Sequence, residues 1–231
     1  MTDYIALLVQ LRPILVLLLA AIVINWLIAY LKNRKNTNVK SSKQKSKDEL
    51  RWSLDLLMSL EWKRYEEICR ELLQIEVKGR LNVNVTQIGA DGGIDLTVTD
   101  SKGKLLAIGQ CKAWSNIVGV SLIRELYGVM ASEKVEQGYF FATSSFSNDA
   151  IEFAKGKKIN LVDGAQQIKM ILSLSRQQQI RLMKVATAGD YQTPTCPRCD
   201  KKMIRRNSNK GEFWGCLNYP RCKATLNVRT K

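Results

Sequence analysis

Three polar side chains on one predicted hairpin could together bind a divalent cation. Residues 94–112 alternate apolar and polar positions around a short turn, which predicts two antiparallel strands. If residues 102 and 103 form the centre of that turn, Asp95 faces Gln110 across the hairpin. Lys112 then lies on the same face as Gln110, because side chains alternate along a strand. A carboxylate, an amide oxygen and an ammonium group on one patch would suit a hard divalent cation.

A second chemical signal is a group of four cysteines at the C-terminal end. The cysteines are Cys196, Cys199, Cys216 and Cys222. Two cysteines separated by two residues form a knuckle, and a second pair closes a tetrahedral thiolate site for Zn²⁺. The residues from Lys202 to Trp214 alternate well enough to form a hairpin between the pairs. A segment this short buries little surface, so the metal would supply its folding energy.

Composition excludes several mechanisms and favours polyanionic partners. The 231 residues contain no histidine, which excludes Ser-His-Asp triads and zinc sites with imidazole ligands. Hydrolysis must then use carboxylates, amides, lysine and metal ions. The formal net charge is +15, which favours nucleic acid or an anionic membrane face as a partner. Cysteines clustered for metal binding, instead of spread as a disulfide framework, indicate a reducing compartment.

One acidic residue of the first predicted helix of the main domain lies beside its apolar face. Leu57 to Leu73 has helical periodicity. At 100° per residue, Glu66 falls on the flank of the apolar stripe, whereas Glu67 and Glu71 fall on the opposite side, toward water. A carboxylate at the edge of a buried face usually has a partner. Either a functional role for Glu66 or a structural salt bridge or cap satisfies this requirement.

The N-terminal segment predicts a membrane anchor. Pro13 to Leu31 is a nearly unbroken apolar run, which as a helix spans about 28 Å, close to the bilayer core. Basic residues follow the run, and only Arg12 precedes it, so the C-terminal bulk is expected in the cytoplasm. A cleaved signal peptide and a buried core helix are the alternatives. The expected location is the cytoplasmic (inner) membrane, with a single pass and contact with the lipid bilayer.

Strands alternate with helices in the central region, which predicts an α/β fold with a mixed sheet flanked by helices. A single helix is expected from Ala165 to about Val185. We expect five segments: a transmembrane helix in 1–32, a basic linker in 33–49, the main domain in 50–176, a helix end and linker in 177–194, and a zinc ribbon in 195–231.

The main domain resembles the Mrr branch of the PD-(D/E)xK nucleases, whose fold is restriction-endonuclease-like. The resemblance rests on Asp91-Gly-Gly-Ile-Asp95, on Gln110-Cys-Lys112, and on the downstream motifs at 141–147 and 159–164. It implies that Asp95 is the main Mg²⁺ ligand, supported by the Gln110 side chain and the Cys111 backbone carbonyl. Lys112 would orient or activate the attacking water. The resemblance also implies an active-site role for Glu66, and Asp91 either acts directly or only shapes the glycine turn.

The cysteine-rich tail resembles the zinc ribbons at the C-terminal end of bacterial type I topoisomerases. The matching residues are Cys-Pro-x-Cys, Gly211-x-Phe213-x-Gly215-Cys216 and Asn218-Tyr219-Pro220-x-Cys222. This resemblance implies binding of single-stranded DNA. Basic residues that track phosphates and aromatic residues that stack on bases agree with it. The nucleic-acid-binding candidates are Arg205, Arg206, Trp214 and Tyr219.

The sequence thus predicts a membrane-anchored, Mg²⁺-dependent DNA endonuclease, with a role in restriction of foreign or modified DNA implied by the resemblance. Double-stranded DNA would bind the nuclease domain and single-stranded DNA the ribbon, and a homodimer is left open. Two alternatives stay open. One is a catalytically inactive, membrane-tethered DNA-binding protein, and the other is a nuclease that acts on RNA.

Overall fold

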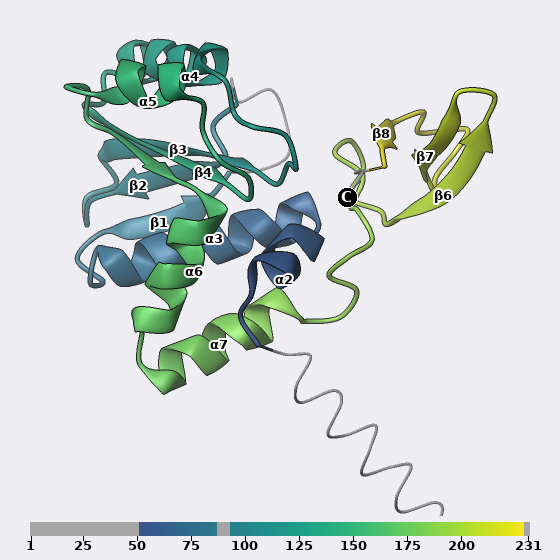
Figure 1. The fold of residues 1–231 in the computed structure, drawn as a ribbon, viewed down its shortest axis with the longest axis horizontal. Coiled ribbons are helices and arrows are strands. Elements are labelled where there is room, and N and C mark those ends of the chain that lie inside the picture. The colour runs from purple at the N-terminus through teal and green to yellow at the C-terminus, as the bar shows by residue number, and fades with distance from the viewer. Residues whose placement is uncertain (1–50, 87–92, 229–231) are drawn as a thin grey trace, which may run out of the picture. The chain divides into compact units, whose positions relative to one another are not determined.

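The computed structural model describes residues 51–86 and 93–228 (Figure 1). The predicted membrane helix, the basic linker and Asp91 lie outside these residues. Among the helices that the structure does describe, none has both the length and the apolar character needed to cross a membrane. The helices are α2 (Leu54–Ser59), α3 (Trp62–Glu76), α4 (Val120–Ser132), α5 (Asn148–Ala154), α6 (Gly164–Ser173) and α7 (Arg176–Ala186). The strands are β1 (Asn82–Val85), β2 (Leu96–Thr99), β3 (Leu105–Lys112), β4 (Gln137–Ala142), β5 (Ile159–Val162), β6 (Met203–Ser208), β7 (Gly211–Cys216) and β8 (Thr225–Asn227).

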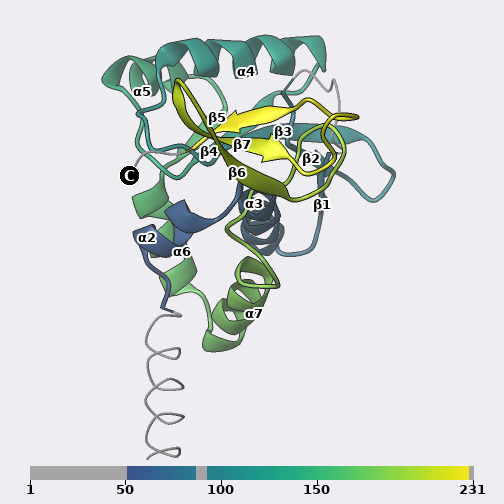
Figure 2. The same cartoon turned by 90° about the vertical axis from the view of Figure 1, so that its right-hand side faces the viewer.

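The first five strands form one mixed sheet in the order β1-β2-β3-β4-β5. The pairs β1–β2 and β2–β3 are antiparallel, whereas β3–β4 and β4–β5 are parallel. Helices α4 and α5 cover one face of the sheet, and α3 and α6 lie on the other (Figure 2). The predicted α/β fold with a mixed sheet flanked by helices is therefore confirmed.

Each face of the sheet has its own apolar core. On the α3 side, Tyr65, Leu73 and Phe141 are fully buried. On the α4 side, Ile123 and Phe140 are fully buried. The alternation of Phe140 and Phe141 between the two cores follows from the two-residue period of a strand. Burial on both faces explains why β4 is apolar throughout residues 138–142.

Two helix predictions need correction. The continuous helix expected from Ala165 to about Val185 is instead two helices, because Ser175 caps α7 through a capping box with Gln178. Glu71, expected to face water, is only 5% exposed and forms ion pairs with Arg70 and Arg181. The reason is tertiary: α7 packs against α3 and covers the side of α3 that the helical period assigned to solvent.

The C-terminal segment forms a separate three-stranded antiparallel sheet in the order β6-β7-β8. Its small core consists of Cys196, Met203, Cys216, Cys222 and Ala224. The predicted hairpin between the cysteine pairs is confirmed as β6 and β7. Three of the five core residues are cysteines, so the stability of this sheet depends on the group that binds their sulfur atoms.

Candidate nuclease site and zinc ribbon

Four of the residues predicted for the nuclease site line one cleft of about 1120 Å³. Glu66 reaches it from α3, Asp95 from the residue before β2, and Cys111 and Lys112 from the end of β3. These residues are far apart in the sequence, but the sheet and α3 bring them to one place. Gln110, which belongs to the same predicted set, does not line the cleft, and Asp91 lies outside the described residues.

The register of the hairpin places Asp95 opposite the Gln110–Lys112 segment. Leu96 pairs with Gly109, and the backbone N–H of Asp95 donates to the Gly109 carbonyl at 2.9 Å. The Asp95 Oδ2 accepts a hydrogen bond from the backbone N–H of Cys111 at 2.6 Å. The predicted pairing is confirmed beside the site. At the far end a bulge shifts it, so that Thr99 pairs with Leu105.

The carboxylates of Asp95 and Glu66 both act on the thiol of Cys111. Burial raises the pKa of the Cys111 thiol well above its usual value. A hydrogen bond and charge repulsion from Cys69 add to the rise, followed by the negative charges of Asp95 and Glu66. Cys111 is therefore a neutral thiol, and it lines the same cleft as the Asp95 and Glu66 carboxylates.

Gln110 is buried, with 2% of its surface exposed. Its Oε1 has no hydrogen-bond partner within the part of the chain that the structure describes. A buried amide oxygen without a partner is costly, so it indicates a group absent from the structure, such as a cation or a water. Gly93 packs directly on the same amide: a Cβ on Gly93 would lie 2.6 Å from Gln110 Nε2, and its φ is +82°. This contact explains one glycine of the Asp91–Asp95 motif.

Lys112 has an aromatic neighbour that the sequence prediction missed. The Lys112 Nζ lies 5.8 Å from the centre of the Trp114 ring, and Trp114 lines the same cleft with 45% of its surface exposed. The sequence shows a tryptophan two residues after the candidate catalytic lysine. Only the structure shows that its ring faces the cleft and not the core.

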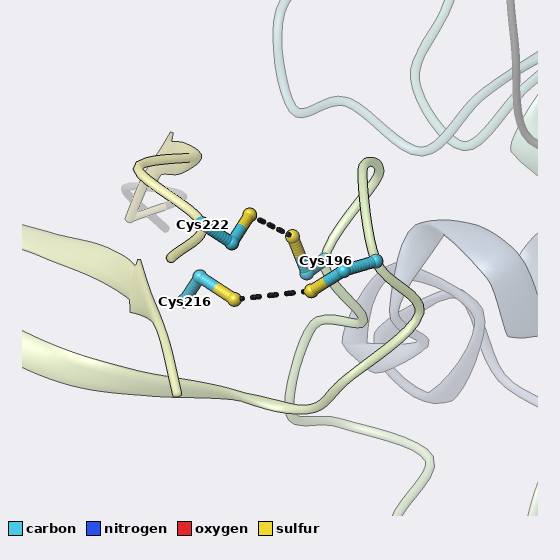
Figure 3. Close-up of side chains that lie close together, drawn as sticks. Cys196, Cys216 and Cys222 are labelled. Carbon is cyan, nitrogen blue, oxygen red and sulfur yellow. Dashed lines mark hydrogen bonds between the residues drawn. The ribbon is translucent and has the colours of Figure 1, made fainter. Parts of the chain in front are cut away.

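The four C-terminal cysteines converge on one point. Figure 3 shows Cys196, Cys216 and Cys222 directed toward a common space. The sulfur atoms of all four lie within 4.8 Å of one another; those of Cys196 and Cys222 are 3.6 Å apart and those of Cys199 and Cys216 are 3.3 Å apart. Four thiolates at the usual Zn–S distance are about 3.8 Å apart in a tetrahedron. The group fits Zn²⁺, as the spacing predicts.

Backbone donors favour the thiolate form of Cys196. Burial raises its pKa, but hydrogen bonds from the backbone N–H groups of Arg198 and Cys199, together with those from the Cys216 and Cys222 side chains, lower the pKa to about 7. The knuckle Cys196–Cys199 therefore supplies a ligand already close to the charge state that a metal requires.

The four predicted nucleic-acid-binding residues lie on two opposite faces of the ribbon. Arg205 pairs with Trp214 across the hairpin, and its guanidinium lies 5.2 Å from the Trp214 ring. Arg206 points to the other face, where it lies over Gly215 and 5.5 Å from the Tyr219 ring. Only the first pair lines the cleft with Asp95 and Lys112.

A buried carboxylate that the sequence prediction missed joins the ribbon to α3. Glu61, 4% exposed, accepts hydrogen bonds from the Thr195 N–H at 2.7 Å and hydroxyl at 2.8 Å, and from Lys202 Nζ at 2.8 Å. The Trp62 indole N–H donates to the Thr195 carbonyl at 2.7 Å. Nothing in the local sequence distinguishes Glu61 from a solvated acid, because its partners are more than 130 residues away.

These two substructures correspond to two known domain families. Residues 57–171 match the Mrr_cat family, described as restriction endonuclease, and residues 193–231 match the topoisomerase DNA-binding C4 zinc finger. The chain therefore combines a restriction-endonuclease-like domain with a topoisomerase-type zinc ribbon. Both resemblances inferred from the sequence motifs are confirmed.

Particular relatives agree with this division. Over 136 residues the chain is 30% identical to the type IV methyl-directed restriction enzyme EcoKMrr of Escherichia coli K12, covering 57% of this chain and 45% of that enzyme. Over 29 residues it is 48% identical to DNA topoisomerase 1 of Helicobacter pylori, covering 13% of this chain and 4% of that enzyme. The matches thus span less than half the length of either relative.

A solved structure is also similar over the same domain. The DNA modification-dependent restriction endonuclease AspBHI superposes with a TM-score of 0.43 and 17% identity, covering 59% of this chain and 39% of that one.

Proposed function

We propose that this chain is a metal-dependent endonuclease that hydrolyses phosphodiester bonds in DNA. The observation that carries the proposal is the meeting of Glu66, Asp95 and Lys112 in one cleft of a restriction-endonuclease-like domain. Two carboxylates and an ammonium group around one space are what a metal-assisted phosphodiesterase requires. The basic net charge of +15 favours the polyanionic substrate.

The donor set fits a hard divalent cation. Asp95, the Gln110 side chain and the Cys111 carbonyl would hold Mg²⁺, and the unpartnered Oε1 of Gln110 is the observation that supports this assignment. When bound, the ion supplies a Lewis acid for the phosphate and a more acidic water.

The chain's own residues position the substrate and stabilise charge. The Cys111 N–H fixes the Asp95 carboxylate. Lys112 orients the attacking water, and its ammonium group offsets the negative charge that grows on the phosphate oxygens. Glu66 adds a second carboxylate from α3, which can accept a proton from that water.

The substrate class follows from the relative. EcoKMrr is named a methyl-directed restriction enzyme. We infer that this chain likewise restricts modified DNA, with the nuclease domain on duplex DNA and the ribbon on unpaired nucleotides.

A nicking assay tests the proposed function. The chain should convert supercoiled plasmid to the open form with Mg²⁺, and Asp95→Asn and Lys112→Ala should each lower the rate by at least about a hundredfold. Lys104→Ala, in the exposed turn of the same hairpin, is the matched control and should keep the full rate. Equal rates for all four proteins would reject the enzyme. Binding without nicking by wild type would favour a DNA-binding protein, and faster cutting of a matched RNA would favour a ribonuclease.

We also propose that residues 1–32 anchor the chain in the cytoplasmic membrane, with the nuclease domain in the cytoplasm and in contact with lipid only through that segment. The apolar run from Pro13 to Leu31 and the basic residues after it support the proposal. Cutting both strands of a duplex takes two sites, so we propose a homodimer as the form that acts on duplex DNA. Recovery of the chain in the soluble fraction after cell lysis would reject the anchor, and a monomeric mass on DNA would reject the dimer.

A further inference from the structure

Two tryptophans line the cleft that contains the candidate catalytic residues. Trp114 follows β3 of the nuclease domain, and Trp214 lies on β7 of the ribbon. Each has a cation near its ring, Lys112 Nζ at 5.8 Å from Trp114 and the Arg205 guanidinium at 5.2 Å from Trp214. The nuclease domain and the ribbon thus contribute similar aromatic-and-cation pairs to the same space.

This pairing has the chemistry of a single-strand binding surface. Aromatic faces stack on bases, and neighbouring cations bind the phosphates between them. Arg205 forms an ion pair with Glu212 at 3.3 Å, and both side chains are more than half exposed. An ion pair this exposed is weak, so Arg205 can exchange Glu212 for a phosphate at little cost.

Base stacking favours one strand over two in this cleft. Its volume of about 1120 Å³ accommodates a few nucleotides. Bases in a duplex are stacked on each other, so a tryptophan face reaches a base only where the strand is unpaired.

A buried contact keeps the ribbon wall of the cleft, formed by Arg205 and Trp214, next to α3. Glu61 immediately precedes α3, which carries Glu66 five residues later. Its carboxylate accepts three hydrogen bonds from Thr195 and Lys202 of the ribbon segment. Trp62, the first residue of α3, also donates to Thr195 and lines the cleft. The ribbon wall is therefore attached to the same helix that carries one of the candidate catalytic carboxylates.

We propose that Trp114 and Trp214 hold an unpaired DNA strand between them and present it to Asp95 and Lys112. The substrate class is then DNA with single-stranded nucleotides at the scissile phosphate, such as a bubble, a gap or a strand from which a base has been turned out. The proposal rests on the proposed nuclease function for its cleavage step, but the strand-binding step stands without it.

Binding of hexathymidine measures what Trp114, on the nuclease wall of the cleft, and Trp214, on the ribbon wall, contribute to strand binding without cleavage. Fluorescence anisotropy of a labelled hexathymidine is measured with the 231-residue chain in detergent, in the absence of added Mg²⁺. Trp114→Ala and Trp214→Ala should each weaken binding at least about fivefold, the usual effect of losing one stacking face. Tyr127→Ala, a change of an exposed aromatic residue on α4 that does not line the cleft, should change it less than twofold. Circular dichroism and zinc content show that each variant is folded.

Three binding results would overturn the proposal. The first is sensitivity to only one of the two tryptophans, which would mean that the strand does not occupy both walls. The second is a larger loss from Tyr219→Ala than from Trp214→Ala, which would place the strand on the other face of the ribbon. The third is hexauridine binding as tightly as hexathymidine, which would reject DNA as the preferred ligand.

Cleavage separates this inference from the proposed function. Two labelled substrates of the same sequence are compared, one fully paired and one with six unpaired nucleotides in the middle. Wild type should cut the second at least tenfold faster, and Trp214→Ala should remove most of that preference. A preference unchanged in Trp214→Ala would overturn the two-wall cleft while leaving the nuclease intact. Tryptophan-dependent binding without cleavage of either substrate would reject the nuclease but support the strand site.

Discussion

Asp95 accepts a hydrogen bond from the N–H of Cys111, so the position of its carboxylate follows from the register of the hairpin. A shift of the pairing by one residue would turn Asp95 to the other face of the sheet and separate it from Lys112. Gln110 presents the opposite situation: its side chain is buried, and its Oε1 has no partner among the described residues. Residues that bind a cation often show this incomplete satisfaction when the cation is absent.

Gln110→Glu tests whether this amide is a metal ligand. A carboxylate is a stronger ligand for a hard cation, so the Mg²⁺ concentration for half-maximal cleavage should fall roughly tenfold. Without Mg²⁺ the added charge is buried near Asp95, and the temperature of unfolding should drop.

The matched control is Gln192→Glu, which adds the same charge at an exposed position of the cleft lining. It should leave both quantities nearly unchanged. An identical Mg²⁺ dependence for wild type and Gln110→Glu would remove Gln110 from the metal site.

At the level of elements, α6 packs closely against the end of β4 and closes the core on the α3 side of the sheet. Gly164 is the first residue of α6, and a Cβ there would lie 2.3 Å from the Thr143 carbonyl oxygen and 2.6 Å from a Leu54 methyl group. A backbone oxygen cannot move aside as a flexible side chain does. The glycine is therefore required by packing between α2, α6 and the residue that follows β4.

Gly164→Ala should destabilise the protein by about 1–3 kcal/mol, the usual cost of overpacking. Gly128→Ala in α4 is the matched control, because a Cβ there meets no atom within 4 Å. That substitution should stabilise the protein by up to about 1 kcal/mol, since alanine is the better helix former. Urea unfolding followed by circular dichroism measures both, and equal midpoints for the two variants would contradict the packing argument.

At the level of the described domain pair, one buried contact connects two parts with separate cores. The nuclease domain has its two cores on either side of the sheet, and the ribbon has a cysteine-rich core of its own. Glu61 joins them through Thr195 and Lys202. The Lys63–Asp200 ion pair lies beside this contact but is more exposed, so it contributes less.

Glu61→Gln should destabilise the protein by about 1–3 kcal/mol, because the buried hydrogen bonds and the charge that Lys202 faces are weakened. Glu67→Gln, whose Arg64 ion pair lies on the same helix with its carboxylate one-third exposed, should cost less than about 1 kcal/mol.

Thermal unfolding and limited proteolysis between residues 187 and 194 measure the loss. Zinc content should be the same in both variants, because neither residue belongs to the four-cysteine site. Faster proteolysis in Glu67→Gln than in Glu61→Gln would show that the ribbon is attached in another way.

The sequence by itself determined the local features. The hairpin of β2 and β3, its register beside Asp95 and Gln110 and the cysteine site all follow from interactions between near neighbours, and each is present as expected. Two-residue alternation also places Arg205 and Arg206 on opposite faces of the ribbon, so the four predicted nucleic-acid-binding residues do not form one surface. Local rules suffice in these cases because the partners are a turn or a strand apart.

Only the tertiary structure decided which polar residues are buried and what shares the cleft. Glu71 is buried because α7 packs over it, and Glu61 is buried because Thr195 and Lys202 return to it from the far end of the chain. Trp114 and Trp214 lie a hundred residues apart, yet they line one cleft. Helical periodicity reports where a side chain points on its own helix, whereas burial depends on what packs there, and long-range packing leaves no periodic signal in the sequence.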